Sequence, residues 1–372
     1  MNPDASKNQR TPFRVGWIIA DQLSRSAFCR SAYLTSGGVG LVRYLWLATY
    51  VNAHGAFGLR HEIYRPWKRY DALIFLKSMG QESMRLLYQK RKRGWPVIFD
   101  TNVNYYERGG MEHYSGMLPS EQQQQDAIEI TRAADSIIAD SEFLASICVK
   151  YNPNVCWLPD SVRMDLVPDC GDWGFDGCKL PLLWSGEAVK LFELLAIEDV
   201  LLKYASRIKL ILVTNSLSAM DRWRPGYRER LEAMLKRISH QIIPYQGILH
   251  LFDVYSRGGV FISPRFLDNT YNLGHTEWKI TLAMACGRMV LCSPVPSYVT
   301  VARRAQNKGI RICETSLQWE SWLEALLSRQ IMLQEEERAA RKVVEDYYET
   351  SVIARQHSTF VRRVIEERHP TS

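Results

Sequence analysis

The chain has 372 residues, of which 46% are hydrophobic and 23% are charged, and its formal net charge is +7. This ordinary globular composition excludes a disordered chain, and the length predicts two domains. The positive charge fits either a solvated basic surface or an anionic partner, such as a nucleotide diphosphate or an anionic lipid. Because the basic residues are scattered apart from the run Lys90–Arg93, we do not expect a nucleic-acid reader.

The cysteines and the N-terminal residues indicate the cellular compartment in which the protein is expected. None of the eight Cys residues forms a C-x-x-C pair or has the spacing of zinc ligands, which favours a reducing compartment and no structural metal. The first 13 residues, MNPDASKNQRTPF, lack an apolar signal core, and no run approaches the ~20 apolar residues of a membrane span. We therefore expect a cytoplasmic protein, with peripheral contact at the inner face of a membrane as the alternative.

Short apolar runs alternate with helical segments in the first part of the chain. The apolar run 14–20 ends at Asp21 and predicts a buried strand, and after a glycine-rich stretch the segment 39–53 has helical length. The elements expected next are a strand at 71–76, a helix at 81–93, a strand at 96–100, a helix at 120–134, a strand at 136–139 and a helix at 141–151. This alternation is typical of βαβ units with a parallel sheet.

The segment 160–180 is rich in Gly, Asp and Pro and has no periodicity, so it predicts an interdomain linker. The alternation then begins again. Strands are expected at 181–184, 208–214, 241–243, 259–263, 289–292 and 310–312, and helices at 188–205, 225–239, 248–256, 276–286, 297–307 and within 316–367.

The fold class expected is α/β, with two Rossmann-like domains whose parallel sheets face each other across a cleft. The domains span 12–163 and 164–344, and a helix at about 345–368 packs back on the first domain; a basic amphipathic membrane helix is the rival interpretation of that segment. Ligands of open parallel sheets bind beyond the carboxyl ends of the strands. The residues at those ends are Asp21, Asp100, Ser141, Gly186, Asn215 and Pro264.

Four segments carry a resemblance to a known family. They are SGGVGLVRYLWLATYVNAHG at 36–55, ADSIIADSEFLASICVKY at 134–151, LLWSGEAVK at 182–190 and GGVFISPRFLDNTYNLGHTEWKITLAMACGRMVLCSPVPSY at 258–298. From about residue 14 to 300 the chain resembles GT-B glycosyltransferases, in particular the retaining family-four (glycosyl transferases group 1) type. The resemblance implies a hexosyltransferase that moves a sugar from a nucleotide-sugar donor to a hydroxyl of a glycan, lipid-linked or other acceptor. It further implies polysaccharide or glycoconjugate assembly and no cofactor.

The resemblance assigns the donor site to the second domain. Lys279, with Met284, Ala285 and Gly287 after it, follows the family layout K-x-x-E-x-M-A-x-G. It implies that Lys279 binds the diphosphate, together with Lys190 and Arg265, near the turn at Gly186. A lysine in the first turn adds a full charge to the partial charge of the helix N-terminus. For Lys190 an exposed helix lysine is the alternative.

The sequence departs from the family pattern at two acids. Where many members have a pair of Glu, this chain has His275 and Leu282. Glu277 is the nearest acid, either as a sugar or ribose contact or as a residue that favours the helix N-terminus. His275 lies in the matched donor loop and is the other candidate for the chemistry.

Further substrate-binding candidates lie in the first domain. The Gly37-Gly38 loop is either a phosphate site at a helix N-terminus or a plain turn. Asp100 either binds an acceptor hydroxyl or caps a loop. His113, in the loop 103–119, is either a base, a sugar contact or simply a polar residue on the surface.

No D-x-D motif stands at a convincing place, so we expect a metal-independent mechanism in which cationic side chains stabilise the leaving diphosphate. The resemblance implies retention of anomeric configuration. Because the Glu pair is missing, the alternative is a catalytically inactive GT-B module that binds nucleotide or sugar or scaffolds a partner enzyme.

Overall fold

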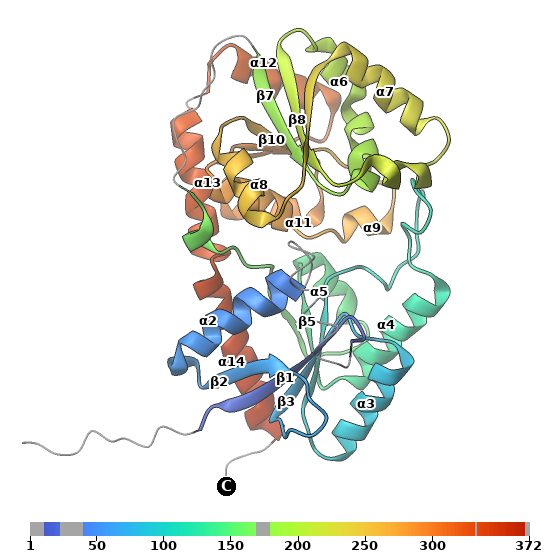
Figure 1. The fold of residues 1–372 in the computed structure, drawn as a ribbon, viewed down its shortest axis with the longest axis vertical. Helices are drawn as coiled ribbons and strands as arrows, with labels where there is room; N and C mark the ends of the chain where they lie inside the picture. Colours follow the sequence, from blue (N-terminus) through green and yellow to red (C-terminus); the bar gives the residue numbers. More distant parts are fainter. Residues whose placement is uncertain (1–10, 23–39, 169–178, 332, 369–372) are drawn as a thin grey trace, which may run out of the picture.

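The fold comes from a computed structural model, which describes residues 11–22, 40–168, 179–331 and 333–368. Two six-stranded parallel sheets form its two halves (Figure 1). We call the part that contains the first sheet the first half and the part that contains the second sheet the second half.

The first sheet has the strand order β2-β1-β3-β4-β5-β6, and all of its neighbours are parallel. Its strands are β1 (Phe13–Ile19), β2 (Leu59–Ile63), β3 (Ala72–Leu76), β4 (Val97–Thr101), β5 (Ser136–Ala139) and β6 (Val155–Trp157). The helices are η1 (Gly40–Trp46, a π-helix), α2 (Leu47–Ala53), η2 (Gly55–Phe57, a 3₁₀ helix), α3 (Gln81–Lys92), α4 (Glu121–Ala133) and α5 (Glu142–Cys148). Every residue of β3, β4 and β5 is buried, as expected for central parallel strands covered on both faces.

The second sheet has the order β12-β11-β10-β7-β8-β9 and is also parallel throughout. Its strands are β7 (Leu180–Ser185), β8 (Ile208–Thr214), β9 (Ser239–Pro244), β10 (Val260–Ser263), β11 (Val290–Cys292) and β12 (Ile310–Ile312). The 3₁₀ helices are η3 (Met164–Leu166), η4 (Ala188–Ile197) and η5 (Leu217–Arg222). The α-helices are α6 (Glu198–Lys203), α7 (Tyr227–Arg237), α8 (Ile248–Ser256), α9 (Thr270–Leu273), α10 (Trp278–Ala285), α11 (Pro296–Arg304), α12 (Ser316–Leu327), α13 (Leu333–Tyr347) and α14 (Thr350–Arg368).

The predicted fold class is confirmed by these two parallel sheets. Two strands that the sequence did not indicate, β2 and β6, are edge strands of the first sheet. β2 reads LRHEI and β6 has three residues. An edge strand tolerates charged residues that face solvent, so neither segment forms the continuous apolar run by which interior strands are recognised.

The last helix, α14, returns to the first half. Val361 and Ile365 of this helix lie in one hydrophobic core with Val15 and Trp17 of β1, and the His357 ring stacks on Trp17 with 5.7 Å between ring centroids. The helix before it, α13, packs instead on α10 of the second half. The domain boundaries at 163 and 344 remain a prediction.

The chain crosses between the halves at two paired segments. Val162 N–H donates to the Tyr348 carbonyl at 2.8 Å, and Thr350 N–H donates to the Val162 carbonyl at 3.0 Å. The outgoing chain near Val162 and the returning chain before α14 therefore run as a short parallel pair. In Figure 1 this crossing lies on the left, where the green segment passes the red helices.

A loop of the first half, residues 103–119, which we call the strap, reaches the second half on the other side (Figure 1, right). Gly110 forms an isolated antiparallel bridge with Asn269, and Tyr114 forms another with Trp223. Gly110 has φ +94°, and a Cβ there would overlap the Asp268 carbonyl oxygen. Only glycine allows so close an approach of the two backbones.

Within the described residues, no helix combines the length and the apolar character needed to span a bilayer.

Candidate functional site

Lys279 lies in the first turn of α10 and is the buried cation of the donor-site prediction. Its ammonium has no hydrogen-bond partner of normal geometry among the described residues and lies 4.9 Å from the centre of the Trp184 ring. Burial, and next the Arg265 guanidinium, hold the pKa of Lys279 well below its usual range. A Cβ at Gly186 would lie 2.9 Å from the Lys279 Nζ atom, so the glycine leaves the space that the ammonium occupies.

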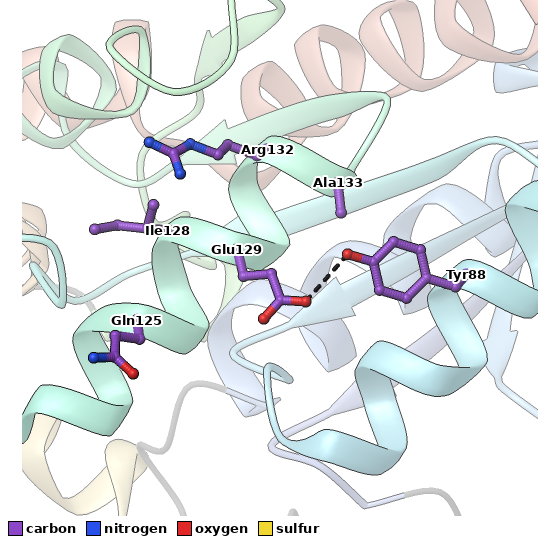
Figure 2. Close-up of a pocket in the computed structure, with 6 residues that line it drawn as sticks. All are labelled: Tyr88, Gln125, Ile128, Glu129, Arg132 and Ala133. Carbon is purple, nitrogen blue, oxygen red and sulfur yellow. Dashed lines mark hydrogen bonds between the residues drawn. The ribbon is translucent and has the colours of Figure 1, made fainter.

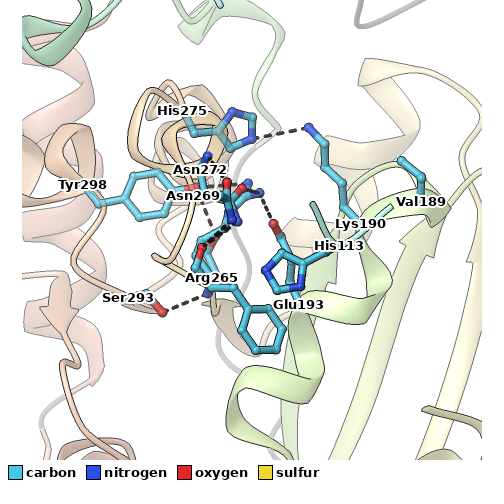
Figure 3. A network of polar contacts seen from close by, with 12 residues as sticks. His113, Val189, Lys190, Glu193, Arg265, Asn269, Asn272, His275, Ser293 and Tyr298 are labelled. Atoms are coloured by element: carbon cyan, nitrogen blue, oxygen red, sulfur yellow. Dashed lines mark hydrogen bonds and ion pairs between the residues drawn. The ribbon is translucent and has the colours of Figure 1, made fainter. Parts of the chain in front are cut away.

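Lys190, from η4, approaches the same place from the end of β7. Its Nζ lies 3.5 Å from the His275 Nε2 atom and 5.3 Å from the Tyr271 ring centre (Figure 3). Burial, then Arg265 and Lys190, keep the pKa of His275 well below its usual range. This shift favours the neutral imidazole, and because a lysine ammonium can only donate, the Nε2 atom is the acceptor in this contact.

Arg265, also predicted to bind phosphate, is fully buried and paired inside the second half. Its Nη1 atom lies 2.6 Å from the Glu193 carboxylate, and the guanidinium reaches Asn272 and Tyr298 at 3.5 Å (Figure 3). Removing one partner of a buried ion pair costs about 3–5 kcal/mol. Arg265 therefore ties the loop 264–277, which contains Asn272, to Glu193 of η4.

Glu277 directly precedes α10 and is buried. Neither of its carboxylate oxygens has a hydrogen-bond partner of normal geometry in the described part of the chain. Burial raises the pKa of Glu277 to about 8, and the nearby Asp160 adds to the effect. Near neutral pH this side chain is mostly a neutral acid, which donates a hydrogen bond as well as accepting one.

Asp100 ends a central strand of the first sheet, but Arg43 holds its carboxylate. The Arg43 Nε atom donates to Asp100 at 2.8 Å, and its Nη1 atom donates to Asp160 at 2.9 Å. Burial raises the pKa of Asp100 to about 6, against the lowering effect of Arg43. Asp140, after β5, is buried with both carboxylate oxygens unpartnered among the described residues. Burial, and next Asp160, raise the pKa of Asp140 well above its usual range.

The structure adds residues that the sequence interpretation did not select. Arg43, Asp140 and Asp160 join Asp100 in one buried cluster. Asp140 had a signal, because it follows a short apolar strand as Asp100 does. Arg43 had none, since it stands inside an apolar helical run where a lone arginine is expected to face solvent.

His113 of the strap is inserted into the second half. Its Nδ1 atom lies 2.8 Å from the Tyr227 hydroxyl, its Nε2 atom lies 2.8 Å from the Asp268 carboxylate, and its ring stacks against both Phe192 and Phe266. Both ring nitrogens are thus engaged. The predicted substrate contact at His113 stays untested, and the observed contacts make it an anchor of the strap.

A cavity of about 270 Å³ lies between the halves, beside the strap. Its polar lining combines two cations, one acid, one amide and three tyrosines: Lys77, Arg222, Glu187, Gln123, Tyr105, Tyr114 and Tyr271. Lys77 follows β3 with a left-handed φ of +51°, a strained conformation for a lysine. Burial, and next the Lys190 charge, lower the pKa of Lys77. The cavity therefore lies next to Lys190, whose ammonium is 5.3 Å from the ring centre of the cavity residue Tyr271.

The other predicted binding residues have local roles or lie outside the described residues. The Asp21 carboxylate accepts from Gly80 N–H at 2.9 Å, next to the start of α3. The Asn215 side-chain oxygen accepts from Ala188 N–H at 2.7 Å, at the start of η4. Gly37 and Gly38 lie outside the described residues.

A second hollow, of about 570 Å³, is an open groove within the first half (Figure 2). It lies between α3 and α4, where the Tyr88 hydroxyl donates to Glu129 at 3.1 Å. None of the candidate residues above line it, so we do not place the site there.

No protein-family model matches the chain, and no curated protein matches its sequence. Among solved structures, the chain is similar to a glycosyltransferase from Rickettsia africae, with 10% identity, 98% of this chain and 100% of that chain covered, and a TM-score of 0.64. It is similar to sucrose-phosphate synthase from Thermosynechococcus elongatus, with 13% identity, coverage of 96% and 100%, and a TM-score of 0.66. HepE from Anabaena, in complex with UDP and glucose, has 11% identity, coverage of 94% and 100%, and a TM-score of 0.60. The chain has the fold of these GT-B glycosyltransferases.

Proposed function

We propose that the protein is a glycosyltransferase that moves a sugar from a nucleotide-sugar donor to an acceptor hydroxyl. The observation that carries the proposal is the buried amino group of Lys279 at the start of α10, which has no hydrogen-bond partner among the described residues and whose charged form is disfavoured by burial. A buried charge without a partner is costly, and an anionic ligand removes that cost. The positive end of the α10 dipole, at which Lys279 stands, adds to the attraction for such a ligand.

The chemistry follows from the charges around Lys279. Breaking the bond between the sugar and the diphosphate leaves negative charge on the leaving group. Lys279 and Lys190 stabilise that charge, and each charge-assisted hydrogen bond contributes about 1.5–3 kcal/mol. His275 positions Lys190, and Glu277 meets a sugar or ribose hydroxyl. We propose that this arrangement acts without a metal and with retention of configuration.

The cavity between the halves fits the acceptor. Its tyrosine rings offer apolar faces with polar tips, which suit the alternating faces and hydroxyls of a sugar. Because it adjoins Lys190, an acceptor hydroxyl there would lie near the donor diphosphate. The acceptor is a glycan, a lipid-linked or another hydroxyl compound, and the pathway is polysaccharide or glycoconjugate assembly.

The test is a titration of UDP, GDP, ADP and their sugar conjugates with EDTA present, followed by thermal stability. A neighbour of similar fold was solved with UDP and glucose, so uridine nucleotides come first. A ligand at 100 times its dissociation constant stabilises by about 2.7 kcal/mol. We expect one nucleotide family to do so in the wild type and in Lys236→Ala, an exposed lysine of α7, but not in Lys279→Ala.

The ligand-induced shift is compared within each variant, because Lys279→Ala also removes a buried charge. If no nucleotide shifts the wild type, with or without a divalent cation, the donor site is wrong. If a nucleotide sugar binds and is never turned over with any acceptor, the binding-module alternative replaces the transferase.

A further inference from the structure

The net charge of the chain is concentrated in one short segment. Between Arg60 and Trp95 there are ten Lys and Arg residues and three Asp and Glu residues, an excess of +7. The formal net charge of the whole chain is also +7. The other residues therefore balance to zero, and the basic character of the protein belongs to one part of the first half.

The structure brings two pieces of this segment together. One is the connection from β2 to β3, and the other is the last turn of α3 with the residues after it. The Tyr70 and Trp95 rings are in contact at 6.1 Å, and the Lys90 ammonium lies 4.3 Å from the Trp95 ring and 5.6 Å from the Tyr64 ring. These contacts fix the two basic pieces as neighbours. We call them the basic face: Arg65, Trp67, Lys68, Arg69, Arg91, Lys92 and Arg93.

Most of the charge on this face is not neutralised within the protein. Glu62 pairs with Lys68 at 2.6 Å, and Asp135 pairs with Arg91 at 3.1 Å. The remaining four cations, Arg65, Arg69, Lys92 and Arg93, form no ion pair with a described residue. Like charges held together in this way repel one another, and an anionic surface relieves that repulsion.

An indole stands among these cations. Trp67 is 78% exposed, the highest value among the large apolar side chains of the described residues. An exposed tryptophan is unfavourable in water alone. Tryptophan is enriched at the boundary between lipid and water, where its ring meets both.

The basic face lies away from the candidate site. Arg69 stands shortly before β3, and Arg93 shortly before β4. Both therefore belong to the amino edge of the first sheet, whereas the candidate site is built at the carboxyl edges. A large surface that binds this face leaves the cleft open.

We propose that the basic face docks the protein on an anionic membrane surface, with Trp67 inserted at the lipid–water boundary. Clustered Lys and Arg bind the negative cytoplasmic leaflet, and each contributes when it comes close to the surface. A single indole ringed by cations fits a flat apolar boundary. A binder of single-stranded nucleic acid uses a groove with several stacking aromatics instead.

The experiment measures co-sedimentation of the full chain with vesicles of phosphatidylcholine alone and of phosphatidylcholine mixed equally with phosphatidylglycerol. We expect binding to the anionic vesicles only, decreasing as salt is raised. Lys92→Glu/Arg93→Glu should weaken it by about tenfold or more, since each charge is worth about fivefold. Trp67→Ala should weaken it at unchanged salt dependence, because it removes the apolar contact alone.

Matched controls come from the second half. Lys236 and Arg237 are exposed at the last turn of α7, as Lys92 and Arg93 are near the end of α3, and Leu317 is 76% exposed. Lys236→Glu/Arg237→Glu and Leu317→Ala should bind as the wild type does.

Three results would overturn the proposal. The first is that the wild type does not bind anionic vesicles. The second is that the control variants lose as much vesicle binding as the variants of the basic face. The third is that single-stranded RNA displaces the protein from the vesicles and binds Trp67→Ala with the same affinity as the wild type. The measurement uses no sugar nucleotide, so its outcome is independent of the proposed transferase activity.

Discussion

At the scale of single residues, the protonation of Lys279 is coupled to ligand binding. Its pKa is held below the usual lysine range by burial and by Arg265, so its surroundings favour the neutral amine more than those of a surface lysine do. A bound diphosphate favours the ammonium and raises this pKa. Lys279 is therefore expected to take up a proton when the diphosphate binds.

The first prediction follows from this coupling. Binding of a nucleoside diphosphate should take up protons, up to about one per site, in the pH range between the lowered pKa of Lys279 and its higher pKa in the complex. Calorimetry in buffers of different ionisation enthalpy measures this uptake. Lys236→Ala should keep it and Lys279→Ala should lose it; a binding heat that does not depend on the buffer in the wild type contradicts the prediction.

The second prediction concerns Glu277, whose pKa rises from 4.5 unfolded to about 8 folded. Between these values the Glu277 side chain binds more protons in the folded protein than in the unfolded chain, so its contribution to stability should fall as pH rises from about 4.5 to 8. The upper bound is several kcal/mol, at about 1.4 kcal/mol per pH unit. Asp100 and Asp140 have raised pKa values too and act in the same direction. The lowered pKa values of His275 and Lys279 act in the opposite direction.

Urea unfolding at a series of pH values tests it. Glu277→Gln should flatten the slope and stabilise the protein at the alkaline end, because the amide never ionises. Glu229→Gln, on the exposed side of α7, is the control and should retain the slope. An equal slope in Glu277→Gln and the wild type would show that Glu277 is ionised in the folded protein.

At the scale of elements, periodicity identified the interior strands because each is a buried apolar run, as in β3 and β8. It missed β2, whose charged residues read as a loop. It merged α12, α13 and α14 into one helical stretch, although the chain changes halves between Tyr347 and Thr350. Helical propensity continues across that break, so periodicity alone does not locate it. The expectation of a returning helix at about 345–368 came from the family resemblance instead.

The candidate site was predictable only in part, for a related reason. Lys279 and Lys190 stand in motifs, and the structure places Lys279 beside Gly186 and Lys190 beside His275. Arg43 and Lys77 stand in no motif, and their importance comes from burial among groups distant in sequence. Long-range electrostatic contacts of this kind leave no periodic trace in a sequence.

The third prediction concerns the strap. In Gly110→Ala, an alanine has to adopt a left-handed φ of +94°, and its new Cβ overlaps the Asp268 carbonyl oxygen. Gly94→Ala has a similar φ of +80° but no atom within 4 Å of the new Cβ, so it isolates the conformational cost, about 1–2 kcal/mol. We expect Gly110→Ala to cost at least twice as much in urea unfolding and to expose the strap to limited proteolysis. Equal costs would mean that the strap does not bind the second half as described.

At the scale of the whole molecule, the halves are joined on two sides. The strap places His113 between Tyr227 and Asp268, and the paired crossing at Val162 joins the opposite side. The sequence predicted two facing sheets from the order of elements, which survives at the 10–13% identity of the three solved structures above. It did not predict the strap, because loops carry no periodicity and a loop's partner is set by the fold.

The return of α14 has a consequence for how the protein is made. A ribosome releases the residues of β1 to β6 first, yet the core around Val15 and Trp17 also requires Val361 and Ile365. Domains generally fold as units in the order of synthesis. The first half cannot complete its core until α14, the last helix, has been synthesised. The half that is synthesised first therefore closes its core last, and it exposes an apolar face of β1 while the entire second half is being translated.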